Sequence, residues 1–315
     1  MMDNGTGDGN RDWLVVDFDG DNIALGLAAP ASRPIVHSTR AYRSTDFATA
    51  TDCIIGYARD LDIDLKGRRA AIVVAGAIGD DVVKLARGRW IVSIRGIGYL
   101  LGARPFVINT GVAKSWSNLD HSSATHMPLS GSGTIDFSAP GKWTSIKYQG
   151  GLAASMLRRF DDGSLQAMES ECGHIGFSPR GARQRELADA LATTNARVTP
   201  ERMMFVAADD PLWERLSQPT SRTDRDLVRA DMLGAFVGDV VLNFCSWSGV
   251  FLNGDQFQFL VKPDNRAAFD KAFGDKGHFS PNLRAVPRWI VKGEQNNLPG
   301  AAQMLANRLM PGGSG

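Results

Sequence analysis

Two polar residues, Asn109 and Thr110, end an apolar run in the stretch FVINTGVAKSW, residues 106–116. Residues 104–110, RPFVINT, predict a buried strand, and in open α/β sheets the carboxyl ends of strands line the ligand crevice. An amide and a hydroxyl there can hydrogen-bond a ligand. A Thr hydroxyl does not ionise near neutral pH, however, so Thr110 can hold a ligand but cannot act as a general base.

A second polar turn lies near the start of the chain, and it reads Asp17-Phe18-Asp19-Gly20-Asp21-Asn22. WLVVDF before the turn and IALGLAA after it predict the arms of a β-hairpin. Asp, Gly and Asn tolerate positive φ and bond their own backbone, so these residues are explained by turn formation alone. The turn also places two carboxylates, at positions 19 and 21, near its tip.

The composition indicates a folded soluble protein. The 315 residues are enough for two domains, and 43% hydrophobic with 22% charged residues excludes wholesale disorder. Thirty-five Lys and Arg against 34 Asp and Glu give no net field that would draw the chain onto nucleic acid or an anionic membrane. Partners must therefore be recognised by local sites.

Localisation and thiol chemistry follow from what the sequence contains. No apolar run approaches the roughly 18 to 20 residues of a membrane span, and the start MMDNGTGDGN has no leader pattern, so we expect a cytoplasmic protein.

The three cysteines, Cys53, Cys172 and Cys245, are far apart and lack metal-ligand spacing. We expect reduced thiols, with neither a disulfide nor a zinc site.

The first half of the chain alternates helical and buried-strand patterns. Residues 47–65 and 94–104 carry apolar residues at helical spacing, whereas residues 70–78 form a continuous apolar run suited to a strand covered on both faces. This order predicts an α/β fold. Residues 117–145 are rich in Ser, Thr, Gly and His and predict loops and short strands over an active face.

The second half continues the α/β pattern. Helical patterns cover residues 181–204 and 222–247, and an apolar strand is predicted within residues 248–254. Residues 269–309 end in a predicted strand, turn and helix. The order of strand, hairpin, helix, strand and helix at the start of the chain recurs in weak form later. Two duplicated α/β halves are therefore one possible origin of the chain.

Six stretches, taken in order and spacing, resemble the bacterial glucokinases of the actin/hexokinase-like kinase superfamily. They are LVVDFDGDN, VINTGVA, ESECGHIGFSP, VTPERMMF, SGVFLNGD and FDKAFGDKGHFSPNLRAVPRWIV. The most specific is Glu171-Cys172-Gly173-His174, which looks like the E-G-G-H sugar-binding turn of that family with one glycine replaced.

The resemblance implies a two-domain actin-like ATPase, or ribonuclease H-like, architecture with an interdomain cleft. It implies a disordered segment at 1–10, a small α/β domain at 11–109 plus about 297–315, and a large α/β domain at 110–296. Glucose and ATP with Mg would meet in the cleft, and a homodimer is possible.

The sugar pocket is the part of the family pattern that is kept. The matching positions are Asn109, Glu171, His174 and Glu201, whose carboxylates, amide and imidazole suit neutral hydroxyls. The alternative is that Glu201 is a first-turn helix residue favoured by the macrodipole and that His174 is a satisfied structural histidine.

The first phosphate motif of the family, D-x-G-G-T-N, is altered here. Asp17, Gly20 and Asn22 match it, but Asp19 and Asp21 replace a glycine and the threonine. Those two residues approach or bond phosphate in the family, so carboxylates would face the triphosphate.

The other nucleotide motifs are also degenerate. Where the family has a Gly-Thr-Gly-Leu-Gly turn, this chain has YQGGLA, which keeps Gly151 and loses the threonine and the last glycine. At the adenosine end the expected Gly-Gly pair is Gly254 followed by Asp255.

Thr110 occupies the place of the family's catalytic aspartate, next to the retained Asn109. A positioned base is worth typically 10² to 10⁴ in rate, so the sequence predicts a hexose-binding protein that is catalytically impaired or a pseudokinase. The alternative is an active glucokinase, in which Asp19, Asp21 or Glu171 serves as a relocated base or holds a metal. A third possibility is an interaction scaffold that binds neither ligand.

Overall fold

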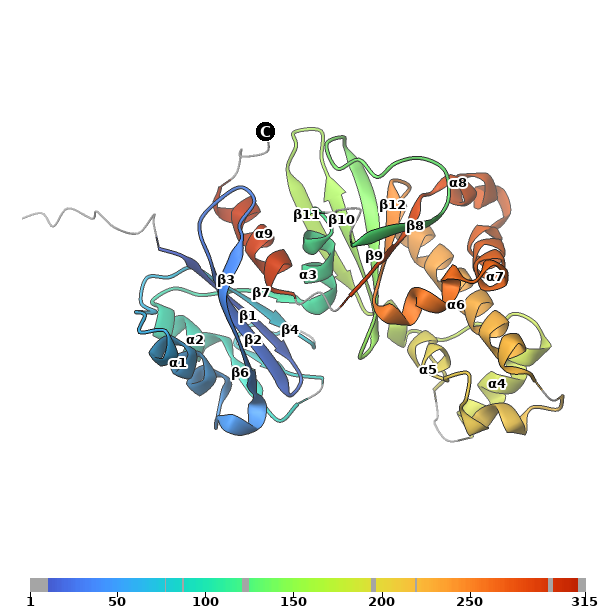
Figure 1. The fold of residues 1–315 in the computed structure, drawn as a ribbon, viewed down its shortest axis with the longest axis horizontal. Coiled ribbons are helices and arrows are strands. Elements are labelled where there is room, and N and C mark those ends of the chain that lie inside the picture. The colour runs from blue at the N-terminus through green and yellow to red at the C-terminus, as the bar shows by residue number, and fades with distance from the viewer. Residues whose placement is uncertain are drawn as a thin grey trace, which may run out of the picture. The chain divides into compact units, whose positions relative to one another are not determined.

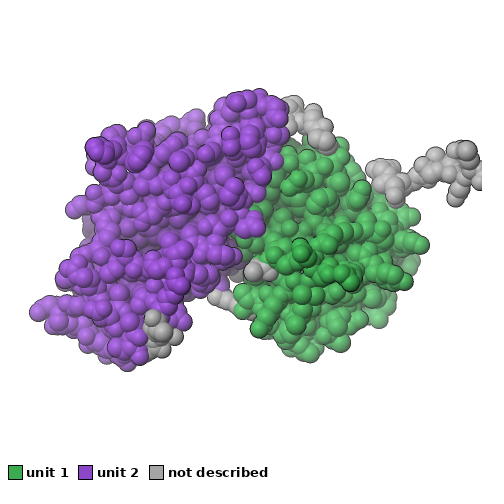
Figure 2. All heavy atoms as spheres, turned by 180° about the vertical axis from the view of Figure 1, so that it is seen from behind, with its two compact units in different colours: residues 1–120, 295–315 green, residues 121–294 purple. Residues whose placement is uncertain are grey.

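The computed structural model describes residues 11–76, 78–86, 88–120, 125–193, 197–218, 220–293 and 297–310. The chain forms two compact units (Figures 1 and 2). Unit 1 comprises residues 1–120 and 295–315, and unit 2 comprises residues 121–294. The expected disordered segment, residues 1–10, lies outside the described residues.

Unit 1 is built from β1 (Trp13–Asp19), β2 (Asn22–Ala28), β3 (Val36–Arg43), η1 (Ser44–Asp46), α1 (Ala50–Asp60), β4 (Ala70–Val74), β5 (Val82–Lys84), β6 (Ile91–Ser93), α2 (Ile94–Leu101), β7 (Phe106–Asn109), α3 (Thr110–Ser117) and α9 (Leu298–Leu309). Its main sheet has the order β3-β2-β1-β4-β7. β1 and β2 form the predicted hairpin, paired from Trp13 and Ala28 to Asp19 and Asn22. The predicted helices at 47–65 and 94–104 correspond to α1 and α2.

The parallel strands of unit 1 align their carboxyl ends. Phe18 of β1 pairs with Val74 of β4, which in turn pairs with Asn109 of β7. The tip of the hairpin and the start of α3 therefore lie at the same edge of this sheet. This is the edge at which open α/β sheets bind ligands.

The core of unit 1 has two layers of helix around the sheet. Alternate strand residues such as Leu14, Val16 and Phe18 pack with α1 and α2 in one apolar cluster, which explains why every residue of β4 is buried. On the other side α9 packs on β1, β4 and α3. A Cβ at Gly300 of α9 would lie 1.9 Å from the Ala113 carbonyl oxygen, so only glycine permits this approach of α9 to α3.

Unit 2 contains β8 (His126–Ser130), β9 (Gly141–Tyr148), β10 (Leu152–Arg159), β11 (Leu165–Ser170), η2 (Cys172–His174), α4 (Ala182–Ala192), α5 (Pro200–Met204), η3 (Pro211–Arg215), α6 (Arg222–Phe244), β12 (Gly249–Asn253), η4 (Asp255–Val261), α7 (Pro263–Gly274), η5 (Gly277–Phe279), α8 (Ser280–Ala285) and β13 (Arg288–Val291). Its sheet has the order β11-β10-β9-β12-β13-β8. β9, β12 and β13 are parallel, and the remaining pairs are antiparallel.

One face of this sheet forms the main core of unit 2. Ile146, Leu152, Val250 and Ile290 pack there with α6 and with Phe269 and Phe273 of α7. α6 begins with a capping box in which Ser221 and Asp224 bond each other's backbone. The opposite face carries a smaller apolar cluster around Trp143 and Phe251.

Two features differ from the sequence-based expectations. The helical pattern at 181–204 is two helices, α4 and α5, because Pro200 and the N-cap Thr199 start a new helix there. The division between the units falls after Asp120, so α3 belongs to unit 1 and residues 110–120 extend that unit beyond position 109. Among the described residues, no helix is long and apolar enough to cross a bilayer.

The close approach of α9 to α3 predicts the effect of one methyl group. Gly300→Ala should lower the free energy of unfolding by about 1–3 kcal/mol, because the new Cβ collides with backbone. Urea unfolding followed by circular dichroism measures this change. Gly98→Ala is the control, since a Cβ in that position of α2 meets its nearest atom at 3.5 Å; it should be neutral or stabilising by up to about 1 kcal/mol. Equal stability of the two variants would contradict the expected collision.

Candidate functional site

A one-turn helix, η2, presents the Glu171–His174 motif at the end of β11. Its backbone is closed by a hydrogen bond from His174 N–H to the Glu171 carbonyl at 2.9 Å. A Cβ at Gly173 would lie 2.0 Å from the Leu152 carbonyl oxygen, so this glycine lets η2 pack against the first residue of β10. The motif is thus held against the β9–β10 hairpin by backbone contact.

Glu201 comes to the same place from the first turn of α5. Its Oε2 accepts a hydrogen bond of 2.8 Å from the backbone N–H of Leu152. His174 Nε2 lies 3.8 Å from Glu201 Oε2 and 3.9 Å from Glu171 Oε2. Three predicted sugar residues of unit 2 therefore converge, with Glu201 the least exposed at 24% and the other two more than half exposed.

The position of α5 is fixed by a tyrosine that the sequence analysis missed. The Tyr148 hydroxyl, at the end of β9, donates to the Met204 carbonyl at the end of α5. Burial raises the pKa of this hydroxyl, so it remains a donor at neutral pH. A pattern of strand residues gives no sign of this role, because it depends on where α5 packs.

Glu201 is also a first-turn helix residue, as the alternative interpretation held. Thr199 caps α5 by accepting from Arg202 N–H, and Pro200 occupies the first turn. The carboxylate does not complete that cap, since its oxygen is bonded to Leu152 of the hairpin. The helix start sets the direction of Glu201, and the hairpin provides its partner.

Cys172 lies inside the same motif but is not a reactive group. Burial raises the pKa of its thiol, so the thiolate form is disfavoured at neutral pH. All three cysteines are free, with Cys53 buried and Cys245 exposed. Burial also raises the pKa of Cys53 to about 12.

Asn109 and Thr110 lie at the junction of β7 and α3 in unit 1. Asn109 is the N-cap of α3, and its Oδ1 accepts from Val112 N–H at 2.8 Å. Thr110 is the first residue of the helix and is only 6% exposed. Neither Asn109 Nδ2 nor the Thr110 hydroxyl bonds another side chain or backbone group within the described ranges, so both remain available to a ligand.

The first phosphate motif forms the predicted tight turn. Gly20 has a positive φ of 67°, and Asp21 is tied to Ser44, whose hydroxyl donates to Asp21 Oδ1 at 2.6 Å. Asn22 Oδ1 accepts from Arg43 at 3.0 Å. Both Asp19 and Asp21 are exposed, so the turn presents two carboxylates at the ligand edge of the first sheet.

Asp17 is buried in β1 and bonds the far end of the chain. Its Oδ2 accepts from Asn297 Nδ2 at 2.9 Å and from Asn297 N–H at 3.4 Å. Asn297 precedes α9, and a carboxylate at a helix N-terminus is favoured by the macrodipole. Asn297 was not predicted as a partner, although NNLPG in the sequence is a recognisable helix start.

The second phosphate motif is the turn between β9 and β10. Gln149 N–H bonds the Gly151 carbonyl at 3.1 Å, and a Cβ at Gly151 would lie 3.2 Å from Glu201 Oε2. The backbone N–H at Leu152, next to this glycine, is therefore already bonded to a carboxylate. A phosphate approaching that N–H would compete with the negative charge of Glu201.

Gly254 follows β12 with a positive φ of 132°, and a Cβ there would lie 2.8 Å from the Tyr148 carbonyl oxygen. The next residue, Asp255, accepts from Gly293 N–H at 3.2 Å and so serves as a loop anchor. No group of three or more His, Cys, Asp or Glu suited to a metal ion occurs in the part of the chain that the structure describes.

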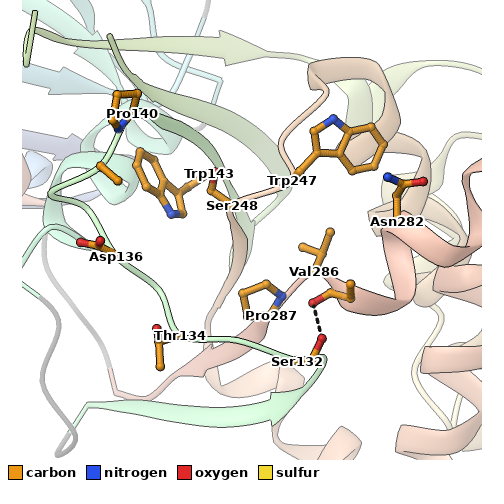
Figure 3. A pocket seen from close by; sticks show the side chains of 12 residues that line it. Ser132, Thr134, Asp136, Pro140, Trp143, Trp247, Ser248, Asn282, Val286 and Pro287 are labelled. Atoms are coloured by element: carbon orange, nitrogen blue, oxygen red, sulfur yellow. Dashed lines mark hydrogen bonds between the residues drawn. The ribbon is translucent and has the colours of Figure 1, made fainter. Parts of the chain in front are cut away.

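A cavity of about 450 Å³ lies elsewhere in unit 2 (Figure 3). Its apolar walls come from Trp143, Trp247, Val286 and Pro287. The Ser132 hydroxyl in its lining donates to the Ala285 carbonyl at 3.4 Å. Its lining contains none of the residues predicted to bind sugar or nucleotide. The converging carboxylates and imidazole, rather than this cavity, are the candidate site.

The fold is that of the sugar kinases with actin-like ATPase architecture, which confirms the predicted α/β class. A crystal structure of glucokinase from an Antarctic psychrotroph matches with a TM-score of 0.77 at 20% identity, covering 94% of this chain and 99% of that chain. Balamuthia mandrillaris glucokinase in complex with glucose matches with a TM-score of 0.74 at 15% identity, covering 96% and 95%.

The chain belongs to the glucokinase family, because the family model described as Glucokinase matches residues 14–205 and 226–308. A glucokinase of Yersinia enterocolitica is 25% identical, covering 94% of this chain and 97% of that protein. One of Xylella fastidiosa is 24% identical, covering 92% and 93%. The predicted family resemblance is confirmed.

The hydrogen bond between Glu201 and Leu152 predicts a graded loss of stability. Glu201→Ala should lower the free energy of unfolding by roughly 1–2 kcal/mol, since it leaves the N–H of a buried residue without its acceptor. Glu201→Gln keeps an acceptor oxygen and is the matched control, which should lose clearly less. Both changes are measured by urea unfolding. An alanine variant as stable as the glutamine variant would show that this bond does not hold the hairpin.

Proposed function

We propose that this glucokinase-family protein binds a hexose, glucose in the first instance, and that it is impaired in transferring phosphate from ATP. The observation that carries the proposal is the convergence of Glu171, His174 and Glu201 beside the Leu152 N–H. Carboxylates and imidazole offer acceptors and a donor matched to neutral hydroxyls. Asn109 is the fourth sugar residue of the proposal, and Thr110 can add a hydroxyl contact.

The negative charge at the phosphate turns supports the proposal that phosphate transfer from ATP is impaired. Asp19 and Asp21 add negative charge where the family's motif approaches phosphates, and Glu201 occupies the N–H beside Gly151. Like charges disfavour a triphosphate there, although water and salt weaken the repulsion at exposed groups. The residues present fit a sugar better than they fit ATP with Mg.

The missing base gives the second support. In an active enzyme of this family a carboxylate after Asn109 would take the proton from the attacking hydroxyl. Thr110 is a neutral alcohol at the first turn of α3 and stays neutral at physiological pH. Without a positioned base the rate falls typically by 10² to 10⁴.

The second candidate is an active glucokinase that forms glucose 6-phosphate with a relocated base. Family membership and the retained Asp17, Gly20 and Asn22 favour it. A Streptomyces griseus glucokinase with a TM-score of 0.55 was solved with glucose and AMPPNP, so the fold can hold both ligands. A cytoplasmic location and a homodimer fit either candidate and remain proposals.

Calorimetric titration with glucose, and separately with Mg-ATP, distinguishes the candidates. We expect saturable heat with glucose and weak or no heat with Mg-ATP, because the sugar residues converge and the phosphate turns carry acid. Heat with both ligands, together with glucose 6-phosphate formation in a coupled assay, would establish the active kinase instead. Absence of heat with glucose would contradict the proposal and leave an interaction scaffold.

Restoring the family's residues should raise turnover. Thr110→Asp combined with Asp19→Gly and Asp21→Thr returns the base and removes the two acids, so we expect a rise in glucose phosphorylation of roughly a hundredfold or more. Thr110→Asn is the matched control, since it changes the same position without supplying a base. A triple variant no faster than the parent would count against a decayed kinase.

A further inference from the structure

The cavity of unit 2 lies at the amino-terminal edge of the parallel strands β9, β12 and β13 (Figure 3). Trp143 is near the start of β9, Ser248 directly precedes β12 and Pro287 directly precedes β13, and all three line the cavity. The candidate hexose residues converge at the other end of β9, where Tyr148 pairs with Leu152. From Trp143 to Tyr148 the strand extends about 16 Å. The cavity is therefore separate from the candidate site.

The loop between β8 and β9, which forms one wall of the cavity, is anchored at two points. Ser132 donates to the Ala285 carbonyl through its N–H at 3.1 Å and through its hydroxyl at 3.4 Å. Further along, Ile135 and Phe137 pack in the small apolar cluster with Trp143, and the ring centroids of Phe137 and Trp143 are 4.7 Å apart. This wall is therefore formed before a ligand arrives, as is usual for small-molecule sites.

The polar groups of the lining offer both acceptors and donors. Asp136 Oδ1 accepts from the hydroxyl and the N–H of Ser138, at 2.6 and 2.8 Å. These bonds hold the pKa of the Asp136 carboxyl below its ordinary value, so it is ionised at neutral pH and its Oδ2 can accept from a ligand. On the opposite side, the Asn282 amide makes no hydrogen bond within the described ranges. Thr134 and Ser248 add hydroxyls.

Two tryptophans border the cavity from opposite sides (Figure 3). Trp143 is 2% exposed, and its enclosed Nε1 has no acceptor among the described residues. Buried donors normally have a partner, so this N–H is a place where a ligand can supply one. Trp247 is 36% exposed and stacks with Phe279, with ring centroids 6.1 Å apart. Phe279 does not line the cavity, so it supports the Trp247 indole from outside.

We infer that this cavity binds a neutral disaccharide, as a second ligand site independent of the proposed hexose site. A sugar hydroxyl both donates and accepts, so one molecule can serve the Asp136 carboxylate, the Asn282 amide and the Trp143 N–H together. The apolar face of a sugar ring can pack on an indole, and indoles on two sides suit two rings. The volume of about 450 Å³ falls within the roughly 300 to 1,000 Å³ of small-molecule sites.

Charge decides between classes of ligand. Asp136 is the one charged residue of the described lining, and Arg159, which acts on it electrostatically, does not line the cavity. A phosphorylated or carboxylated ligand would meet this carboxylate without a facing cation. An organic cation would pair with Asp136 but leave the Trp143 N–H without an acceptor. A neutral ligand with many hydroxyls satisfies both groups.

Calorimetry with maltose, cellobiose and trehalose on the full chain tests the inference. At least one of these disaccharides should bind saturably, with the same affinity in the presence and absence of glucose. Trp247→Ala removes an aromatic wall and Asp136→Asn removes a charged acceptor, so each should weaken this binding about tenfold. Trp247→Phe should retain most of it. Tyr99→Ala is the control and should have no effect, since it removes a 93% exposed aromatic side chain from unit 1.

The outcomes separate the inference from the proposed function. Failure of all three disaccharides to bind, displacement of the bound disaccharide by glucose, or unchanged affinity in both the alanine and the asparagine variant overturns the inference. Binding of choline through Asp136, with no disaccharide bound, would make the ligand a cation and also overturn it. If glucose does not bind while a disaccharide binds through Trp247, the proposed function fails and the inference stands. Unfolding midpoints of the variants verify that each is folded.

Discussion

The hydrogen bond from Leu152 N–H to Glu201 is the interaction on which the candidate site depends. It joins a helix that starts at Pro200 to a hairpin some fifty residues earlier, and Tyr148 reinforces the junction by bonding the end of the same helix. Gly173 completes the arrangement, because a side chain there could not pack on Leu152. Three separate segments are thereby held so that two carboxylates and an imidazole meet around one backbone group.

Unit 1 supplies a second constraint, the alignment of its parallel strands. Phe18, Val74 and Asn109 are in register across β1, β4 and β7, so the acidic turn and the start of α3 share one edge of the sheet. Which chemistry that edge performs is decided by side chains rather than by the fold. The strand ends alone are compatible with a kinase, and Thr110 with the two aspartates of the turn are the reason for proposing that phosphate transfer is impaired.

Much of the fold could be predicted from periodicity and turn chemistry. The hairpin at β1 and β2, the buried run of β4 and the capped helix α6 are all encoded locally, by alternation, by Asp-Gly-Asp-Asn and by Ser221 with Asp224. The partners of the site could not be predicted in this way. Leu152 contributes a backbone N–H, and Asn297 meets Asp17 across most of the chain, so each contact depends on tertiary packing that no local pattern records.

The place of α9 in unit 1 has a consequence for the order in which the molecule is made. A ribosome delivers β1 first and α9 only after the whole of unit 2, yet α9 covers one side of the unit 1 sheet and the residue before it bonds Asp17. Unit 2 is contiguous and can mature during translation, whereas unit 1 waits with an uncovered apolar surface. Until α9 has been synthesised, the face of the unit 1 sheet that it covers stays exposed, and Asp17 lacks its partner Asn297.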